Sequence, residues 1–271
     1  MSQDSNDSSS ELKMSFEDLN LSKDLLKGVA ELGFEEPSPI QAMAIPFIME
    51  GRDVVGQAQT GTGKTAAFSL PILNDINVRS KKVQALVLCP TRELAVQVAE
   101  EVTSLATHLR GLGVLPVYGG QSLDRQIRVL ARGVQFVVGT PGRVLDHLER
   151  GTLNLDSLQT LVLDEADEML DMGFREDIEN VLKKAPEGCR KVCFSATMPK
   201  DILALIKGYM NDPEFVKVTR KEVTVTNIEQ FYYDVRPHRK TESLCLMLDV
   251  HDFNKGIVFC STKRGVDELT T

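Results

Sequence analysis

Residues 53–73 read DVVGQAQTGTGKTAAFSLPIL: a short apolar run, a loop rich in glycine and threonine, and a segment with helical spacing. Gly61 and Gly63 allow the backbone to curl until successive N–H groups face a single anion. The N-terminus of the following helix adds a favourable dipole. Lys64 supplies a mobile positive charge for the outer phosphates, and Thr65 a hydroxyl ligand for Mg²⁺. The stretch therefore predicts a phosphate-binding loop between a strand and a helix.

The loop departs from the usual pattern at its first position, where Ala58 replaces a glycine. A plain turn between a strand and a helix is the alternative interpretation, which the Gly-Lys-Thr sequence directly before a helix argues against. We assign the rest of the loop to the same phosphate-binding site: Gln59, Thr60, Gly61, Thr62 and Gly63.

Short apolar runs alternate with longer segments of helical period on both sides of this loop. The apolar runs predict buried strands over residues 53–56, 85–89, 114–117, 136–138, 160–163, 192–194 and 215–218. The longer segments predict helices over residues 64–76, 92–108, 123–131, 142–149, 175–184 and 199–209, with two more before the first strand, at 21–32 and 39–46. Such alternation predicts an α/β fold, with a mostly parallel sheet covered on both faces.

A second motif, LVLDEADEML at residues 161–170, places acidic residues at the end of a predicted strand. Ligands of parallel sheets collect beyond the carboxyl ends of strands. Asp164 is placed to hold Mg²⁺ through water, and Glu165 to orient and deprotonate an attacking water. A solvated helix start is the usual alternative for a run of acids, and the glycine-rich loop elsewhere in the chain disfavours it.

Composition places the chain among ordinary globular proteins, with 42% hydrophobic and 26% charged residues. The net charge of −8 argues against a surface coated in basic residues, but half of it lies before Leu21, so a local nucleic-acid patch is not excluded. No run approaches the roughly 18 apolar residues of a membrane span, and the N-terminus does not resemble a signal peptide. The five cysteines predict reduced core residues in a cytoplasmic protein. We expect the histidines at the surface: His108, His147, His238 and His251.

The polar segment 219–228 predicts a linker. Before it, residues 1–13 are rich in Ser, Asp and Asn and predict a disordered tail, and residues 14–218 predict one complete domain. After it, residues 229–271 predict a strand at 230–235, a helix at 240–250 and a strand at 256–260. This last segment is too short for an independent α/β domain, so we expect the incomplete start of a second one.

The series of motifs resembles that of the DEAD-box RNA helicases, a superfamily 2 group built from RecA-like domains. Asp164-Glu165-Ala166-Asp167 spells the family name, and the stretch 16–41, with Phe16 and the sequence GFEEPSPIQ, resembles its Q motif. The remaining motifs follow in the family's order: PTRELA at 90–95, Gly119-Gly120, TPGR at 140–143, SAT at 195–197 and IVFCST at 257–262. The resemblance implies a RecA-like P-loop NTPase domain followed by a truncated second RecA-like domain.

The resemblance also implies an ATP hydrolase with ATP and Mg²⁺ as cofactors and with Glu165, Lys64 and Asp164 as its catalytic residues. The amide of Gln41 suits adenine N6 and N7, and Phe16 would stack on the adenine face. Ser38 would bond to the backbone of the phosphate-binding loop. Outside the family context these three residues are equally well interpreted as a helix cap, a core aromatic and a turn residue.

The family further implies contact with one RNA strand along its sugar-phosphate backbone, without base readout. The residues implied are Pro90, Thr91, Arg92, Glu93, Gly119, Gly120, Thr140, Pro141, Gly142 and Arg143. Hydroxyl groups of Ser195 and Thr197 are expected to bond to Asp167 and so to couple the ATP site to the RNA face.

The implied activity is ATP-dependent RNA unwinding or remodelling of RNA–protein complexes by a cytoplasmic monomer that has no membrane association. Nothing after Lys263-Arg264 matches the family's later arginine-containing motifs, so we expect this chain to be a fragment with little activity alone. An ATP-gated RNA clamp or scaffold without productive unwinding is the alternative. A metabolic P-loop kinase is a remote third, because it would lack the motifs at 90–95, 119–120 and 140–143.

Overall fold

The structure is a computed structural model that describes residues 14–218, 229, 231–251 and 255–270. The chain separates into two compact units, Met1–Thr219 and Arg220–Thr271. The predicted disordered tail (1–13) and the predicted linker (219–228) lie outside the described residues. Within the described part of the chain, no helix has the length and apolarity needed to cross a bilayer.

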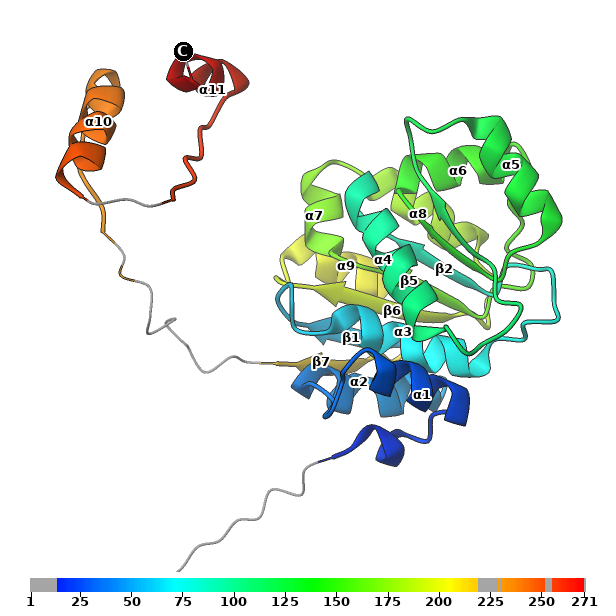
Figure 1. Ribbon diagram of the computed structural model, residues 1–271. Helices are drawn as coiled ribbons and strands as arrows, with labels where there is room; N and C mark the ends of the chain where they lie inside the picture. Colours follow the sequence, from blue (N-terminus) through cyan, green and yellow to red (C-terminus); the bar gives the residue numbers. More distant parts are fainter. Residues whose placement is uncertain (1–13, 219–228, 230, 252–254, 271) are drawn as a thin grey trace, which may run out of the picture. The chain divides into compact units, whose positions relative to one another are not determined.

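A seven-stranded sheet forms the centre of the first unit, and all its strand pairings are parallel, which confirms the predicted sheet (Figure 1). Its strands lie in the order β3-β4-β2-β5-β6-β1-β7. Their bounds are Val54–Gln57 (β1), Ala85–Leu88 (β2), Val114–Val117 (β3), Phe136–Gly139 (β4), Thr160–Leu163 (β5), Arg190–Ser195 (β6) and Glu214–Lys217 (β7).

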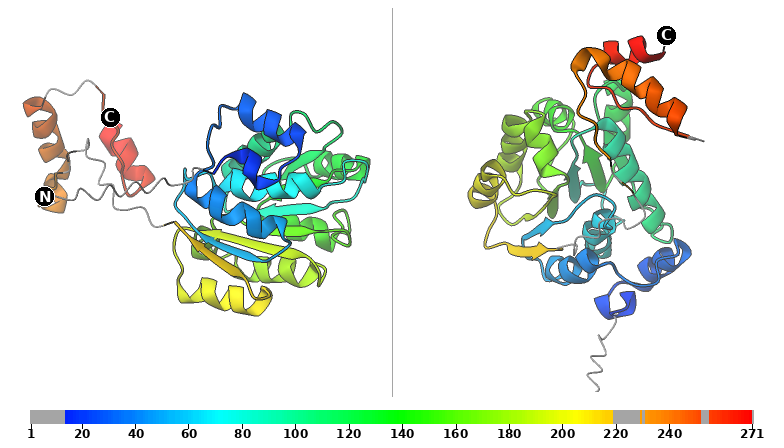
Figure 2. Two further views of the ribbon diagram at one scale, coloured as in Figure 1. Left: turned by 90° about the horizontal axis from the view of Figure 1, so that it is seen from below. Right: turned by 90° about the vertical axis from the view of Figure 1, so that its left-hand side faces the viewer.

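Helices cover both faces of this sheet (Figure 2). One core cluster joins the sheet to α1 (Lys23–Glu31), α2 (Pro39–Met49), α3 (Lys64–Asp75) and α4 (Arg92–Leu105). The other joins it to α6 (Pro141–Glu149), α7 (Ala166–Asp171), α8 (Arg175–Lys184) and α9 (Lys200–Tyr209). α5 (Leu123–Arg132) lies beside the edge strand β3. Along β2, Ala85 and Val87 enter the first cluster and Leu86 and Leu88 the second, so burial on both faces explains the continuous apolar run.

The predicted elements of the first unit are all present, with ends within three residues of those expected. Two short elements were not predicted: the 3₁₀ helix η1 (Phe16–Leu19) and the six-residue helix α7. α2 also continues past its predicted end, because Pro46 is accommodated inside the helix.

The second unit contains helices but no strand among its described residues. These helices are η2 (Pro237–Arg239), α10 (Lys240–Val250) and α11 (Lys263–Thr270), of which α10 confirms the predicted helix. The predicted strands at 230–235 and 256–260 are wrong for the part of the chain that is described. A strand exists only through hydrogen bonds to a neighbour, and the apolar side chains here stay exposed, with Phe231 at 76% and Phe259 at 91%.

The parallel pairing of the first unit brings the predicted motifs to one place. Because all the strands point the same way, the segments after them leave the sheet at a single edge. These segments contain the glycine-rich loop after β1 and the motifs that follow β2, β3, β4, β5 and β6.

Candidate active site

The glycine-rich loop rests on the segment that begins α2. Gly63, the N-cap of α3, has a φ of 90°, and a Cβ there would lie 2.5 Å from Nε2 of Gln41. The Gln41 amide accepts a hydrogen bond from the Ser38 backbone N–H (2.9 Å) and donates one to the Gly63 carbonyl (3.1 Å). Gln41 is therefore both a cap of α2 and a brace of the loop, and its adenine contact stays a prediction.

Three charged groups meet where β5 ends against this loop. Nζ of Lys64 lies 3.7 Å from Oε1 of Glu165, and the side chains are 7% and 22% exposed. Asp164 is buried, and its Oδ1 and the Lys64 Nζ have no hydrogen-bond partner among the residues that the structure describes. Buried charged groups need partners, so this arrangement fits Mg²⁺ on the carboxylate and phosphate on the ammonium.

Burial raises the pKa of Asp164 to about 6, although the positive charge of Lys64 acts in the opposite direction. The negative charge of Glu165 adds to the upward shift. A bound divalent cation would remove the cause of this shift by stabilising the ionised carboxylate. The carboxylate is thus costly to the folded chain until a cation pairs with it.

We expect Asp164→Asn to stabilise the chain when nucleotide and Mg²⁺ are absent. The pKa of Asp164 lies above its unfolded value of 3.8, so the folded state takes up protons between those values and loses stability as the pH rises through them. One pKa unit corresponds to about 1.4 kcal/mol, which makes the cost on the order of 3 kcal/mol at about pH 7.5. Thermal unfolding in a chelator should show a midpoint several degrees higher for the variant.

The pH dependence separates this effect from a general one. The stabilisation should be complete above about pH 6 and should disappear below about pH 4, where Asp164 is protonated in both states. Asp124→Asn, which changes an exposed carboxylate on α5, serves as the control and should leave the midpoint unchanged. A variant less stable than the parent at about pH 7.5 would contradict the assignment.

Glu165 has an uncommon backbone conformation. It is the N-cap of α7 and has a φ of 53° and a ψ of 53° in the left-handed region. Non-glycine residues rarely occupy this region, and such strain concentrates at active sites. The turn directs the carboxylate towards Lys64, which is where the predicted catalytic base is needed.

A series of hydrogen bonds connects the loop to the start of α7. The Ala58 N–H donates to the carbonyl of Ser195 (3.1 Å), whose hydroxyl donates to the carbonyl of Thr197 (2.6 Å). The N–H and hydroxyl of Thr197 both donate to Oδ2 of Asp167, at 2.9 and 2.8 Å. Burial alone would raise the pKa of Asp167, and the bonds from Thr197 reverse the shift and hold that pKa below its ordinary value. The predicted bond to Asp167 is thus made by Thr197, and the Ser195 side chain also helps to lower the pKa of Asp167 while its hydroxyl donates to the Thr197 carbonyl.

Two further side chains near the site, Phe16 and Glu101, have environments that the sequence did not establish. Phe16 is 5% exposed and its ring stacks on Phe34, with centroids 6.3 Å apart, so its adenine contact stays a prediction. Glu101 of α4 was not among the site residues expected from the sequence. It accepts a hydrogen bond from the Thr65 hydroxyl, and burial raises its pKa. No local pattern marks Glu101, because its partner comes from another helix.

The residues expected to contact RNA lie on adjoining segments of the same edge. Arg92 begins α4 and is exposed, and a Cβ on Gly120 would lie 3.8 Å from its Nη1. Arg143 donates from its own Nη1 to the Gln121 carbonyl (3.2 Å). The segments at 90–93, 119–120 and 140–143 are therefore neighbours. Their other members also lie at strand ends and helix starts: Pro90, Thr91, Glu93, Gly119, Thr140, Pro141 and Gly142.

The prediction that all four histidines lie at the surface is wrong for His147, which is 0% exposed. Both its ring nitrogens are hydrogen-bonded, Nε2 to Gln126 at 2.9 Å and Nδ1 to Thr152 at 2.8 Å. The local pattern gives little signal for this burial, because among the residues three or four positions away on the helix only Val144 is large and apolar, whereas Arg143 and Arg150 are charged. The cysteine prediction fails in a similar way at Cys245, which is exposed, whereas Cys89, Cys189 and Cys193 are buried.

Comparison with known proteins gives consistent matches. The sequence profile of the DEAD/DEAH box helicases matches residues 38–205. The chain is 51% identical over 254 residues to the DEAD-box ATP-dependent RNA helicase CshA of Geobacillus kaustophilus, covering 94% of this chain and 54% of that protein. It is 50% identical over 258 residues to CshA of Bacillus subtilis, covering 95% and 52%. The chain therefore spans about half the length of the curated relatives it matches.

Solved structures with the same fold are also similar in sequence. A crystal structure of a DEAD box protein from the hyperthermophile Methanococcus jannaschii superposes with a TM-score of 0.74 and 44% identity, covering 95% of this chain and 69% of that one. A hypothetical ATP-dependent RNA helicase from Sulfolobus tokodaii gives 0.67 and 34%, covering 73% and 57%. The seven-stranded unit thus matches RecA-like domains.

Proposed function

The chain belongs to the DEAD/DEAH box helicase family, and on that basis we propose that the full-length protein is an ATP-dependent RNA helicase. It would couple ATP binding and hydrolysis to RNA binding without sequence readout and to local unwinding or remodelling. The observation that supports this most directly lies beside the glycine-rich loop, where the buried Lys64 Nζ and Asp164 Oδ1 make no hydrogen bond with any described residue and Glu165 is still 3.7 Å from the ammonium. Such a pair fits a metal-bound nucleotide.

In this proposal each residue of the site has a separate task. The loop 58–65 surrounds the phosphates with backbone N–H groups, and Lys64 contacts the outer ones. Thr65 and Asp164 would hold Mg²⁺, which when bound neutralises charge between the outer phosphates. Glu165 orients the attacking water and accepts its proton. Gln41, Phe16 and Ser38 serve the adenine and the loop, a role supported by the contact of Gln41 with Gly63.

RNA would lie along the three adjoining segments 90–93, 119–120 and 140–143. Their exposed glycines and helix starts offer N–H groups, and Arg92 and Arg143 offer guanidinium groups. The Thr197–Asp167 bonds lie between β6 and α7 and support a link from this face to the nucleotide. ATP and RNA would together close a second domain over the site.

We expect Arg92→Ala to weaken binding of single-stranded RNA and to lower the salt dependence of the affinity by about one unit of slope, as for one lost phosphate contact. Titration of a fluorescent RNA at several salt concentrations, with a non-hydrolysable ATP analogue present, measures both. Arg110→Ala is the matched control, because Arg110 is exposed beyond the opposite end of α4. An unchanged slope for Arg92→Ala would remove Arg92 from the interface.

RNA-stimulated ATP hydrolysis by the full-length protein tests the function as a whole. ATP-dependent displacement of a strand from a short duplex then separates a helicase from an ATP-gated clamp. Hydrolysis that ignores RNA would contradict the proposal. RNA binding and hydrolysis without displacement would favour the clamp.

We further propose that the protein acts in the cytoplasm as a monomer. The support is that all five cysteines are free thiols, which suits a reducing compartment. Size-exclusion chromatography coupled to light scattering tests the monomer.

A further inference from the structure

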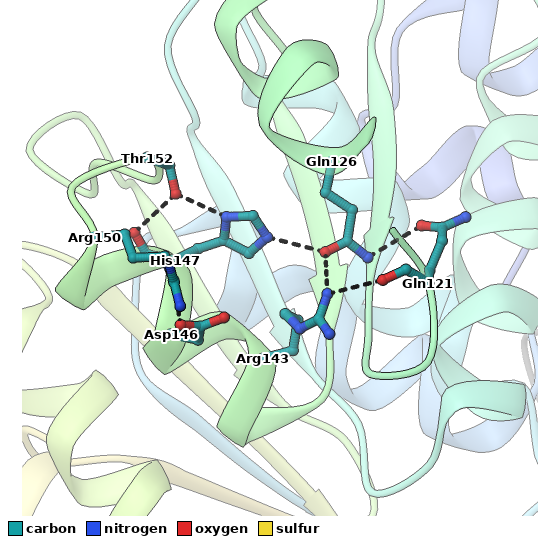
Figure 3. Close-up of polar contacts among 7 residues, drawn as sticks. All are labelled: Gln121, Gln126, Arg143, Asp146, His147, Arg150 and Thr152. Carbon is teal, nitrogen blue, oxygen red and sulfur yellow. Dashed lines mark hydrogen bonds and ion pairs between the residues drawn. The ribbon is translucent and has the colours of Figure 1, made fainter. Parts of the chain in front are cut away.

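Gln126 is the one fully satisfied buried amide in the network drawn in Figure 3. It is 1% exposed and is the buried residue of α5. Its Nε2 donates to the Tyr118 carbonyl (3.1 Å) and to Oε1 of Gln121 (3.0 Å). Its Oε1 accepts from Nη1 of Arg143 (3.0 Å) and from Nε2 of His147 (2.9 Å). An amide side chain has two donors and one acceptor oxygen with two lone pairs, so its full capacity is used.

The orientation of this amide is the only one that the partners permit. Arg143 can only donate, and the Tyr118 carbonyl can only accept. A flipped amide would place two donors against each other on one side and two acceptors on the other. Oε1 therefore faces α6, and Nε2 faces the segment after β3.

His147 completes the arrangement from the interior. Because Oε1 of Gln126 only accepts, Nε2 of His147 must carry a proton, and in the neutral ring Nδ1 accepts from the Thr152 hydroxyl. Burial lowers the pKa of His147, and the charge of Arg143 lowers it further. The ring is thus neutral, in one tautomer, and holds Gln126 from the side opposite to Gln121.

Three partners of Gln126 lie in or directly beside two of the segments assigned to RNA. Tyr118 and Gln121 enclose the exposed turn Gly119-Gly120, and Arg143 lies in the first turn of α6. Arg143 uses its Nη1 for both Gln126 and the Gln121 carbonyl (3.2 Å). Within the described residues its other guanidinium donors have no partner, so they can bind a phosphate while Nη1 stays fixed.

We propose that Gln126 is a positioning residue that joins the Gly119-Gly120 turn to the first turn of α6, so that both bind one RNA strand as a rigid unit. The inference rests on the proposed function, since RNA is the anion assigned to these segments. A pre-formed pair of sites binds a backbone more tightly than two that move independently, because less motion is lost on binding. Gln126 itself does not touch the RNA.

The test uses Gln126→Leu, which keeps the size of the side chain and removes all four hydrogen bonds. We expect its affinity for single-stranded RNA to fall by about tenfold, with the affinity for a fluorescent ATP analogue unchanged. The salt slope should remain that of the parent, because no phosphate contact is lost, whereas Arg143→Ala should lower it by about 1. Equal losses of RNA and nucleotide affinity would indicate a general structural role and overturn the proposal.

Two further variants with smaller expected losses of RNA affinity help to distinguish the proposed role from misfolding. Gln126→Glu keeps the acceptor for Arg143 and His147 but loses the donors to Tyr118 and Gln121, so its RNA affinity should be intermediate. Gln121→Ala keeps the backbone carbonyl that Arg143 uses and should stay within about twofold of the parent. If Gln121→Ala lost as much RNA affinity as Gln126→Leu, Gln126 would not be the residue that joins the two segments.

Hydrogen exchange separates failure of this inference from failure of the proposed function. In the absence of RNA, the amides of Gln126→Leu should exchange faster than those of the parent at both 118–121 and 142–144, and at the same rate in the loop 58–65. Unchanged exchange at 118–121 and at 142–144 would overturn the inference even if RNA binds. If the parent itself binds no RNA, the proposed function fails, and the exchange data alone decide whether Gln126 joins the segments.

Discussion

We expect Glu165→Gln to reduce RNA-stimulated ATP hydrolysis by about 10²–10⁴-fold while ATP binding stays close to that of the parent. Glutamine has nearly the same shape as glutamate and fits the same left-handed backbone position before α7. Its amide cannot accept the proton of an attacking water. The variant therefore removes one chemical ability and leaves the geometry of the site in place.

The contact with Lys64 determines the expected binding result. Glu165 lies 3.7 Å from Nζ of Lys64, so its carboxylate competes with phosphate for the ammonium. Removing the negative charge should leave nucleotide affinity the same or slightly higher. Glu168→Gln, an exposed acid on the same helix, is the matched control and should turn over normally. A Glu165→Gln protein that hydrolyses ATP at the parental rate would mean that another group is the base.

We expect Lys64→Ala to lower the affinity for Mg²⁺–ATP by about 10–100-fold, the range for a charge-assisted hydrogen bond. The Lys64 side chain is 7% exposed, and within the described structure its ammonium group makes no hydrogen bond, with the Glu165 carboxylate 3.7 Å away. Holding such a group out of water is unfavourable unless an anion binds there. Titration of the present chain with a fluorescent ATP analogue measures the loss.

Two companion variants show whether charge or shape matters at this position. Lys64→Arg keeps the charge but has a larger head, and in the tight space beside Glu165 we expect it to restore affinity only in part. Lys27→Ala removes an exposed lysine of α1 and should have no effect. Equal affinities of the parent and Lys64→Ala would show that the ammonium does not contact the phosphates.

The sequence indicated the glycine-rich loop and the acidic strand end because their chemistry limits the choice of residue. Only a few residue types suit a loop whose backbone N–H groups converge on an anion before a helix. The stretch that ends in Lys64 and Thr65 contains such residues in the required order. Asp164 follows a run that is apolar because β5 is buried on both faces. Local patterns of this kind carry their own structural meaning.

The roles of Gln126, His147 and Glu101 could not be deduced in the same way. Each depends on a partner from another element: Arg143 for Gln126, Gln126 for His147, and Thr65 for Glu101. A polar residue on an apolar helix face marks a buried position, but the pattern does not say what lies opposite. Only the packing of α5 against α6 and of α3 against α4 supplies that information.

The incorrect strands of the second unit have a related cause. The aromatic and β-branched residues at 230–235 and 256–260 favour strands, but a strand forms only when a neighbour supplies its hydrogen bonds. The described residues of this unit include no such neighbour. The helix α10 was predicted correctly because its hydrogen bonds lie within the segment itself.

The order of the strands also determines when the strand before the glycine-rich loop can pair during protein synthesis. β1 is the first strand to leave the ribosome, yet both its neighbours, β6 and β7, are the last strands of the unit. Pairing between segments so distant in the chain is slow, because a long loop must close before any contact is gained. Val54 and Val55 therefore have no partner strand until nearly the whole unit has been translated. A growing chain that ends before β6 therefore leaves both edges of β1 without a partner strand, which is a condition that favours aggregation.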